Sequence, residues 1–107
     1  MKNTVFFTAT IILSTLIAGY MQAAETPSAT LGEKLFNDSA LGGTDNEKSC
    51  NSCHPGGKGL VDAGSNPRLA VNINRCITGP LDGQAIKDDS IEMQSIKLYI
   101  QSLKEKK

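Results

Sequence analysis

The most regular pattern of apolar and polar positions lies near the C-terminus, between residues 89 and 104. Apolar side chains recur there every three or four positions, which predicts a helix with one buried face. The buried face is expected to consist of Met93, Ile96, Tyr99, Ile100 and Leu103. Asp89 or Ser90 is expected to cap this helix, with Glu92, three residues after Asp89, as the partner in a capping box.

Two shorter helices are predicted upstream of this one. Residues 29–36 form an amphipathic segment whose apolar face consists of Leu31, Leu35 and Phe36. Residues 68–77 form the other segment, and Gly79 followed by Pro80 is expected to end it.

The remaining stretches favour irregular structure. Residues 37–49 are polar and contain a pair of glycines, which predicts a loop. Residues 50–67 hold too many glycines and prolines for a long regular element, so we expect this stretch to wrap around something. No segment alternates strictly between apolar and polar residues, as a half-buried strand would. The pattern therefore predicts an all-α fold with much loop.

The first 24 residues have the pattern of an export signal. Lys2 provides a positive start, an uncharged apolar stretch runs from Val5 to Ala18, and small residues follow at cleavage distance. A retained membrane anchor is the alternative, but a spanning helix needs about 18 or more apolar residues. We expect residues 1–24 to be a signal peptide and residues 25–107 to be one domain, periplasmic or otherwise exported, with membrane contact only through an uncleaved signal.

Composition sets limits on this domain. A chain of about eighty residues buries a low fraction of its surface and usually needs a metal, a disulfide or a cofactor to hold its shape. The sequence has no Trp and few other aromatic residues to build a core. Lys and Arg balance Asp and Glu, so the chain carries no net charge. This balance gives no basis for nucleic-acid binding.

The strongest chemical signal is the run Cys50-Asn51-Ser52-Cys53-His54, a C-x-x-C-H motif. Two thiols three positions apart can form thioethers with the vinyl groups on one edge of a porphyrin, and the adjacent imidazole can then bind the iron. The motif predicts one covalently attached haem c, held by Cys50 and Cys53, with His54 as the proximal iron ligand. A zinc site completed by Cys76 and a redox disulfide are the alternatives.

With this motif in view, the chain resembles the class I c-type cytochromes, with one haem, over most of its length after the signal. The segment with Gly32 and Phe36 is similar to the first helix of that family. The run from Ser90 to Leu103, with its Tyr99-Ile100 pair, resembles the family's last helix. The resemblance implies a few helices wrapped around the haem. It also implies that the first and last helices cross, with Gly32 packed against Tyr99.

The sequence offers two sulfur donors for the sixth position on the iron, Cys76 and Met93. Met93 continues the apolar face of the last helix, where a methionine is more often core packing than a ligand. The family usually places its ligand in the loop before that helix, and Cys76 lies close to this place. Residues 72–90 also resemble segments of exported cytochromes of thiosulfate and other sulfur oxidation, some of which bind iron through a cysteine thiolate. We prefer Cys76 over Met93, with a five-coordinate iron or another donor as further alternatives.

These features favour an electron carrier that passes single electrons between redox protein partners without turning over a substrate. Two other functions stay open, a haem subunit of a sulfur-compound oxidoreductase and a sensor of diatomic gases. The sequence names neither the electron donor nor the acceptor, and it leaves the oligomeric state open.

Overall fold

The computed structural model describes residues 25–106, so the expected signal peptide lies outside the described residues. The helices are α1 (Ala29–Phe36), α2 (Cys50–Cys53), α3 (Leu69–Thr78) and α4 (Ile91–Ser102), with short 3-10 turns at Leu41–Gly43, Pro55–Gly57, Ala63–Ser65 and Leu103–Lys106. No strand occurs within residues 25–106, which confirms the all-α prediction. None of the helices in this part is long and apolar enough to cross a membrane.

Helix α1 begins at a side-chain cap. The hydroxyl of Ser28 accepts a hydrogen bond from the Leu31 amide at 3.0 Å, and such a cap stabilises a helix because the first amides have no partner within it. The helix buries Gly32 and Phe36, while Leu31 and Leu35 are half-buried.

Helix α4 provides the largest buried face. Met93, Ile96, Tyr99, Ile100 and Leu103 are all buried, as the periodicity predicts. The cap is Ser90, whose hydroxyl accepts from the Met93 amide at 3.1 Å. The predicted capping box of Asp89 and Glu92 is therefore wrong, because the chain is extended at Ser90 and the helix starts after this residue. Glu92 instead lies in the first turn, where its charge suits the helix dipole.

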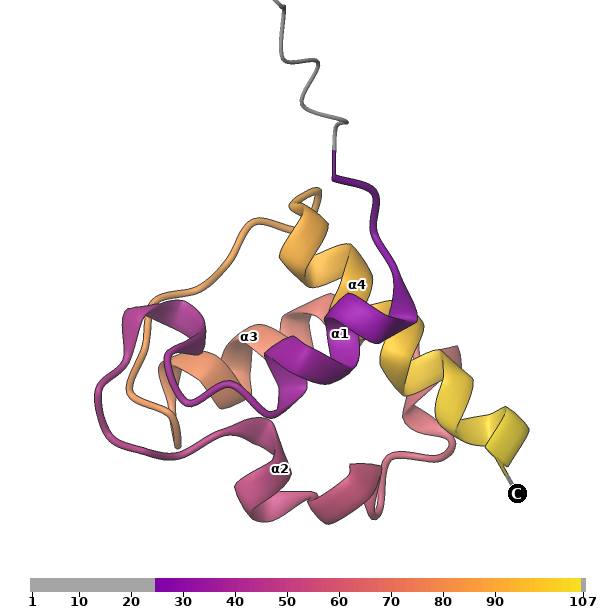
Figure 1. The fold of residues 1–107 in the computed structure, drawn as a ribbon, viewed down its shortest axis with the longest axis horizontal. Helices are drawn as coiled ribbons and strands as arrows, with labels where there is room; N and C mark the ends of the chain where they lie inside the picture. The colour runs from indigo at the N-terminus through magenta and orange to yellow at the C-terminus, as the bar shows by residue number, and fades with distance from the viewer. Residues whose placement is uncertain (1–24, 107) are drawn as a thin grey trace, which may run out of the picture.

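Helices α1 and α4 cross in close contact (Figure 1). A Cβ added to Gly32 would overlap the carbonyl of Ser95 and lie 2.8 Å from Cβ of Tyr99, so only glycine allows this approach. The rings of Phe36 and Tyr99 lie 5.0 Å apart at 59°, a tilted packing that aromatic pairs favour. The expected packing of Gly32 against Tyr99 is confirmed.

The crossing also contains a buried polar contact that the periodicity does not reveal. Ser95 is fully buried on α4, and its hydroxyl accepts a hydrogen bond from the Ser28 amide at 3.1 Å. Because this hydroxyl has a partner, burying it in the crossing carries little penalty. It ties the start of α1 to the middle of α4.

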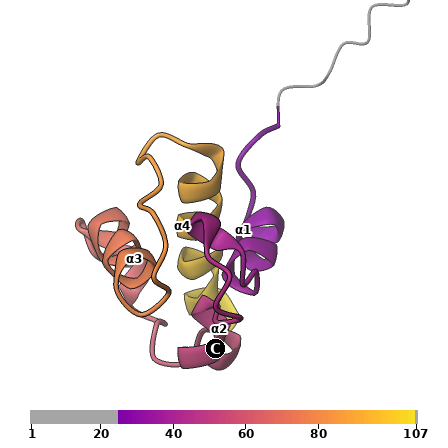
Figure 2. The ribbon, with the colours of Figure 1, turned by 90° about the vertical axis from the view of Figure 1, so that its left-hand side faces the viewer.

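Helix α3 completes the fold, with α4 lying between α1 and α3 in Figure 2. It buries Leu69, Ile73 and Ile77 and ends at Gly79, as predicted. The loop that follows is fastened to α3 by Asn74, whose carboxamide both donates to the Ile86 carbonyl and accepts from the Ile86 amide, at 2.9 Å each. These contacts fix the segment that leads from α3 into α4 (orange in Figure 1).

Candidate functional site

The C-x-x-C-H motif forms the short helix α2 and the residue that follows it. Ser49 and Ser52 form a reciprocal capping box at its start, which satisfies amides that so short a helix leaves free. Cys50 is half-buried, and Cys53 is exposed at the end of the turn. His54 caps the helix through its amide, which donates to the Cys50 carbonyl at 2.9 Å.

The imidazole of His54 is held by a hydrogen bond at its Nδ1 atom. Its Nδ1 lies 3.0 Å from the carbonyl oxygen of Lys58, and a backbone carbonyl accepts only from a protonated nitrogen. This bond places the proton on Nδ1 and leaves the Nε2 lone pair free to bind a metal. The interaction fixes both the tautomer and the direction of the ring.

Gly57 shapes the turn that brings the Lys58 carbonyl back to His54. Its φ is +82°, a left-handed conformation that glycine adopts readily. A Cβ added there would lie 2.7 Å from Cδ2 of Leu103, so the turn packs directly against the C-terminal segment. The turn that follows His54 is thus packed against the helical core.

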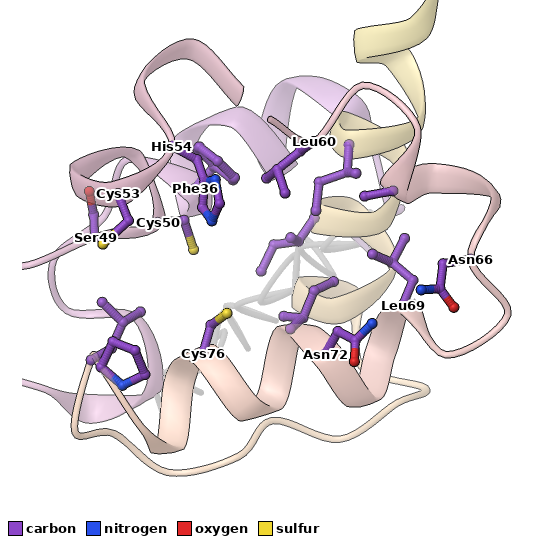
Figure 3. A pocket seen from close by; sticks show the side chains of 16 residues that line it. Phe36, Ser49, Cys50, Cys53, His54, Leu60, Asn66, Leu69, Asn72 and Cys76 are labelled. Carbon is purple, nitrogen blue, oxygen red and sulfur yellow. The ribbon is translucent and has the colours of Figure 1, made fainter. Parts of the chain in front are cut away.

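These side chains border an apolar cavity of about 220 Å³ (Figure 3). It is larger than the roughly 150 Å³ that admits a benzene ring in an engineered core. The cavity is lined by Phe36, Ser49, Cys50, Cys53, His54, Leu60, Ala63, Asn66, Leu69, Asn72, Ile73, Cys76, Pro80, Leu81, Ile96 and Ile100. Residues 50–67 therefore wrap around this cavity, as their composition predicts.

Cys76 lies on α3 and faces the same cavity. Figure 3 shows the sulfur atoms of Cys50 and Cys76 pointing into the cavity from α2 and α3 respectively. Burial above all, with smaller contributions from the nearby Cys76 and Cys53 and against a lowering backbone hydrogen bond, raises the pKa of the Cys50 thiol from its ordinary 9.0 to about 11. At neutral pH Cys50 is therefore a protonated thiol.

Met93 does not share the site. Its side chain is fully buried in the first turn of α4, and it does not line the cavity. The structure thus brings Cys50, Cys53, His54 and Cys76 together around one cavity and leaves Met93 in the core.

The zinc alternative needs Cys50, Cys53, His54 and Cys76 to converge on one point. Within residues 25–106, no three side chains of His, Cys, Asp or Glu gather closely enough to hold a metal ion. No disulfide supports the redox alternative, since Cys50, Cys53 and Cys76 are free thiols within residues 25–106. The donors stand around an apolar space, an arrangement that favours a flat apolar group carrying its own metal over a bare ion.

Two contributors to the site are missing from the sequence-based prediction. One is the Lys58 carbonyl, which the glycines after His54 and their tight turn would have indicated. The other is Asn72, which lines the cavity one helical turn before Cys76. The predicted helix over residues 68–77 already placed these two side chains on one face.

Residues 26–102 match the family model described as di-haem cytochrome c peroxidase. No curated protein and no solved structure matches the chain.

Proposed function

The chain belongs to the di-haem cytochrome c peroxidase family, a family of c-type cytochromes with covalently bound haem, and on this premise we propose that it is an exported monohaem carrier of single electrons. The family assigns a haem-based redox role. The finer statement rests on one observation, the apolar cavity bordered by Cys50, Cys53 and His54 on one side and by Cys76 on the other.

In this proposal the motif holds the cofactor. Cys50 and Cys53 supply the two thioether sulfurs, and Nε2 of His54 supplies the proximal iron ligand. The bond from His54 Nδ1 to the Lys58 carbonyl supports this role, because such contacts orient a ligating imidazole and raise its basicity.

We propose one haem in this chain. The sequence contains a single C-x-x-C-H motif, and His54 is its only histidine. The family description names two haems, and residues 1–107 provide the attachment motif for one.

Cys76 is the proposed distal ligand. Its thiol faces the cavity, whereas Met93 is buried in the first turn of α4 and does not line the cavity. A thiolate ligand favours ferric iron and lowers the reduction potential relative to a thioether. The protein is thus proposed to be a low-potential carrier.

When bound, the haem supplies a reversible one-electron couple at its iron. The chain's own contribution is to hold the imidazole fixed, to exclude water with apolar side chains such as Leu69 and Ile96, and to leave one edge accessible. Cys53, Cys76 and Pro80 line the cavity and are solvent-exposed, so the cavity opens to the surface near them. We place the docking of redox protein partners there, through a small transient interface of under about 1,200 Å².

Export is part of the proposal. The signal-like residues 1–24 support a periplasmic or otherwise exported location, where covalent attachment of haem takes place. The mature protein then begins near residue 25 as one domain.

Replacing each sulfur donor in turn tests the ligand. Cys76→Ala is expected to convert low-spin ferric iron to high spin and to remove thiolate-type spectral features, while Met93→Ala leaves the spectrum unchanged. The opposite result, with loss of the low-spin signal in Met93→Ala alone, would assign the ligand to Met93 and overturn the low-potential carrier.

Two further measurements on the unmodified protein separate the carrier from the other functions. A carrier with a thiolate ligand binds carbon monoxide slowly and is not reduced by thiosulfate. Fast carbon monoxide binding would favour a gas sensor. Thiosulfate-dependent reduction would favour a haem subunit of a sulfur-compound oxidoreductase.

A further inference from the structure

Two loops that border the cavity are joined by one side chain, Asn46. The first loop, residues 44–49, leads into the C-x-x-C-H motif, and the second, residues 79–90, connects α3 to α4. The two loops run side by side at the left of Figure 1. The Asn46 carboxamide donates from Nδ2 to the Leu81 carbonyl at 2.6 Å. This bond therefore links the segment before the motif to the segment after α3.

The rest of the Asn46 carboxamide is fixed on its own loop. Its Oδ1 accepts from the Thr44 hydroxyl and from the Lys48 amide, at 3.0 Å each. A backbone amide can only donate, so the carboxamide oxygen must face Lys48 and the nitrogen faces Leu81. Both ends of the carboxamide are thus used, and its donor points in one direction.

Leu81 is held from two sides. Its amide donates to the Cys76 carbonyl at 3.1 Å, at the end of α3, and its carbonyl accepts from Asn46. The Leu81 side chain is only 3% exposed and lines the cavity. It therefore borders the cavity on the side of Cys76, the proposed distal ligand.

The backbone is strained next to both ends of the Asn46–Leu81 bond. Within residues 25–106, two residues other than glycine have a positive φ, Glu47 at +61° and Asp82 at +54°. Glu47 directly follows Asn46, and Asp82 directly follows Leu81. Such conformations cost free energy in a non-glycine residue and persist where the surrounding contacts hold them. Loss of the bond is therefore expected to favour an arrangement in which the two loops separate.

We propose that Asn46 is a positioning residue: it holds Leu81 over the distal side of the cavity, so that a bound haem accepts an added ligand as bulky as imidazole only when the two loops separate. This inference deepens the proposed function and rests on haem occupying the cavity. A closed distal side suits an electron carrier, because its iron then keeps both ligands and binds no small molecule. Leu81 decides which ligands reach the iron, and Asn46 holds Leu81 in place.

Asn46→Asp tests this role in the haem-loaded protein. The carboxylate keeps an acceptor for Thr44 and Lys48 but loses the donor to the Leu81 carbonyl. Loss of one hydrogen bond should raise the population of the open form, and with it the apparent affinity of the ferric protein for imidazole, about fivefold. Titration with imidazole, followed at the Soret band, measures this affinity. An unchanged affinity overturns the inference.

Asn66→Asp is the matched control. It places the same charge beside the same cavity, but the Asn66 side chain accepts from the Arg68 amide at 2.9 Å, a bond that a carboxylate keeps. The affinity of this variant for imidazole should equal that of the unmodified protein. Equal increases in Asn46→Asp and Asn66→Asp would be an effect of charge and would overturn the inference.

A Leu81→Ala background locates the effect. Truncation of Leu81 should itself tighten imidazole binding, and Asn46→Asp should then add less than about twofold, because it acts through the side chain that has been removed. A full fivefold increase in this background overturns the inference. Failure of the proposed function looks different, since the unmodified protein would then carry no haem. Failure of the inference alone leaves a haem protein whose imidazole affinity does not respond to Asn46→Asp.

Discussion

The chemistry of this chain depends on where its sulfur atoms lie. Cys50, Cys53 and Cys76 reach one apolar cavity from α2 and α3, while Met93 is enclosed by the core beneath α4. A buried thioether on the packed face of a helix serves packing, and its replacement should change the stability of the protein rather than its spectrum.

Met93→Leu tests this difference. The swap nearly conserves volume, so the free energy of unfolding should fall by less than about 1.5 kcal/mol. The reduction potential and the low-spin spectrum should not change. Thermal unfolding followed by circular dichroism, together with potentiometry, gives both quantities. A large change of potential with unchanged stability would contradict the placement of Met93 in the core.

At the scale of single residues, the sequence predicts the residues of the C-x-x-C-H motif but not all of the groups that support them. The C-x-x-C-H spacing identifies three of the candidate haem-binding residues without any structure, because covalent chemistry fixes the spacing. The contact from His54 to the Lys58 carbonyl depends on backbone turns at Gly56 and Gly57; these glycines indicate a tight turn, but only the structure shows which carbonyl it presents to the imidazole. The predicted helix places Asn72 on one face with Cys76, but only the structure shows that this face lines the cavity.

At the scale of elements, the fold depends on how α4 starts and on how it meets α1. Helix bounds follow from periodicity to within a residue or two at most ends, because the buried faces of α1, α3 and α4 are strongly patterned. The cap was harder to assign, since Asp89 and Ser90 are both good capping residues and only the backbone angles decide between them.

Ser90→Ala therefore separates the two capping residues. Loss of the Ser90 hydroxyl removes the bond to the Met93 amide and should lower the free energy of unfolding by about 1 kcal/mol. Asp89→Ala is the control and should have little effect. Chemical denaturation of the two variants measures this directly. A larger loss in Asp89→Ala would restore the capping box that the structure excludes.

Gly32→Ala tests the crossing of α1 and α4. The added methyl group overlaps the Ser95 carbonyl, a backbone atom that cannot move aside cheaply, so the loss should reach or exceed about 3 kcal/mol. Glu33→Ala, an exposed change in the same helix, should be nearly neutral. If Gly32→Ala melts at the same temperature as Glu33→Ala, the helices do not approach as described.

At the scale of the whole molecule, the polypeptide does not fill its own interior. An apolar cavity of about 220 Å³ that opens to the surface leaves the side chains around it without packing partners. A small domain has only a few kcal/mol of stability to spare. We therefore expect the fold to gain stability from a group that occupies the cavity. Composition alone already indicated this need, but only the structure shows where the group fits.

Covalent haem is the central claim, and the intact mass of the purified protein tests it most directly. The protein and a Cys50→Ala, Cys53→Ala double variant are produced in a host competent in cytochrome maturation. Both are extracted with acid–acetone, and their intact masses are measured by mass spectrometry. The account predicts a coloured chain heavier than its polypeptide by one haem, and a colourless double variant that carries none and unfolds at lower temperature. A colourless unmodified protein with the mass of the polypeptide alone would contradict the account.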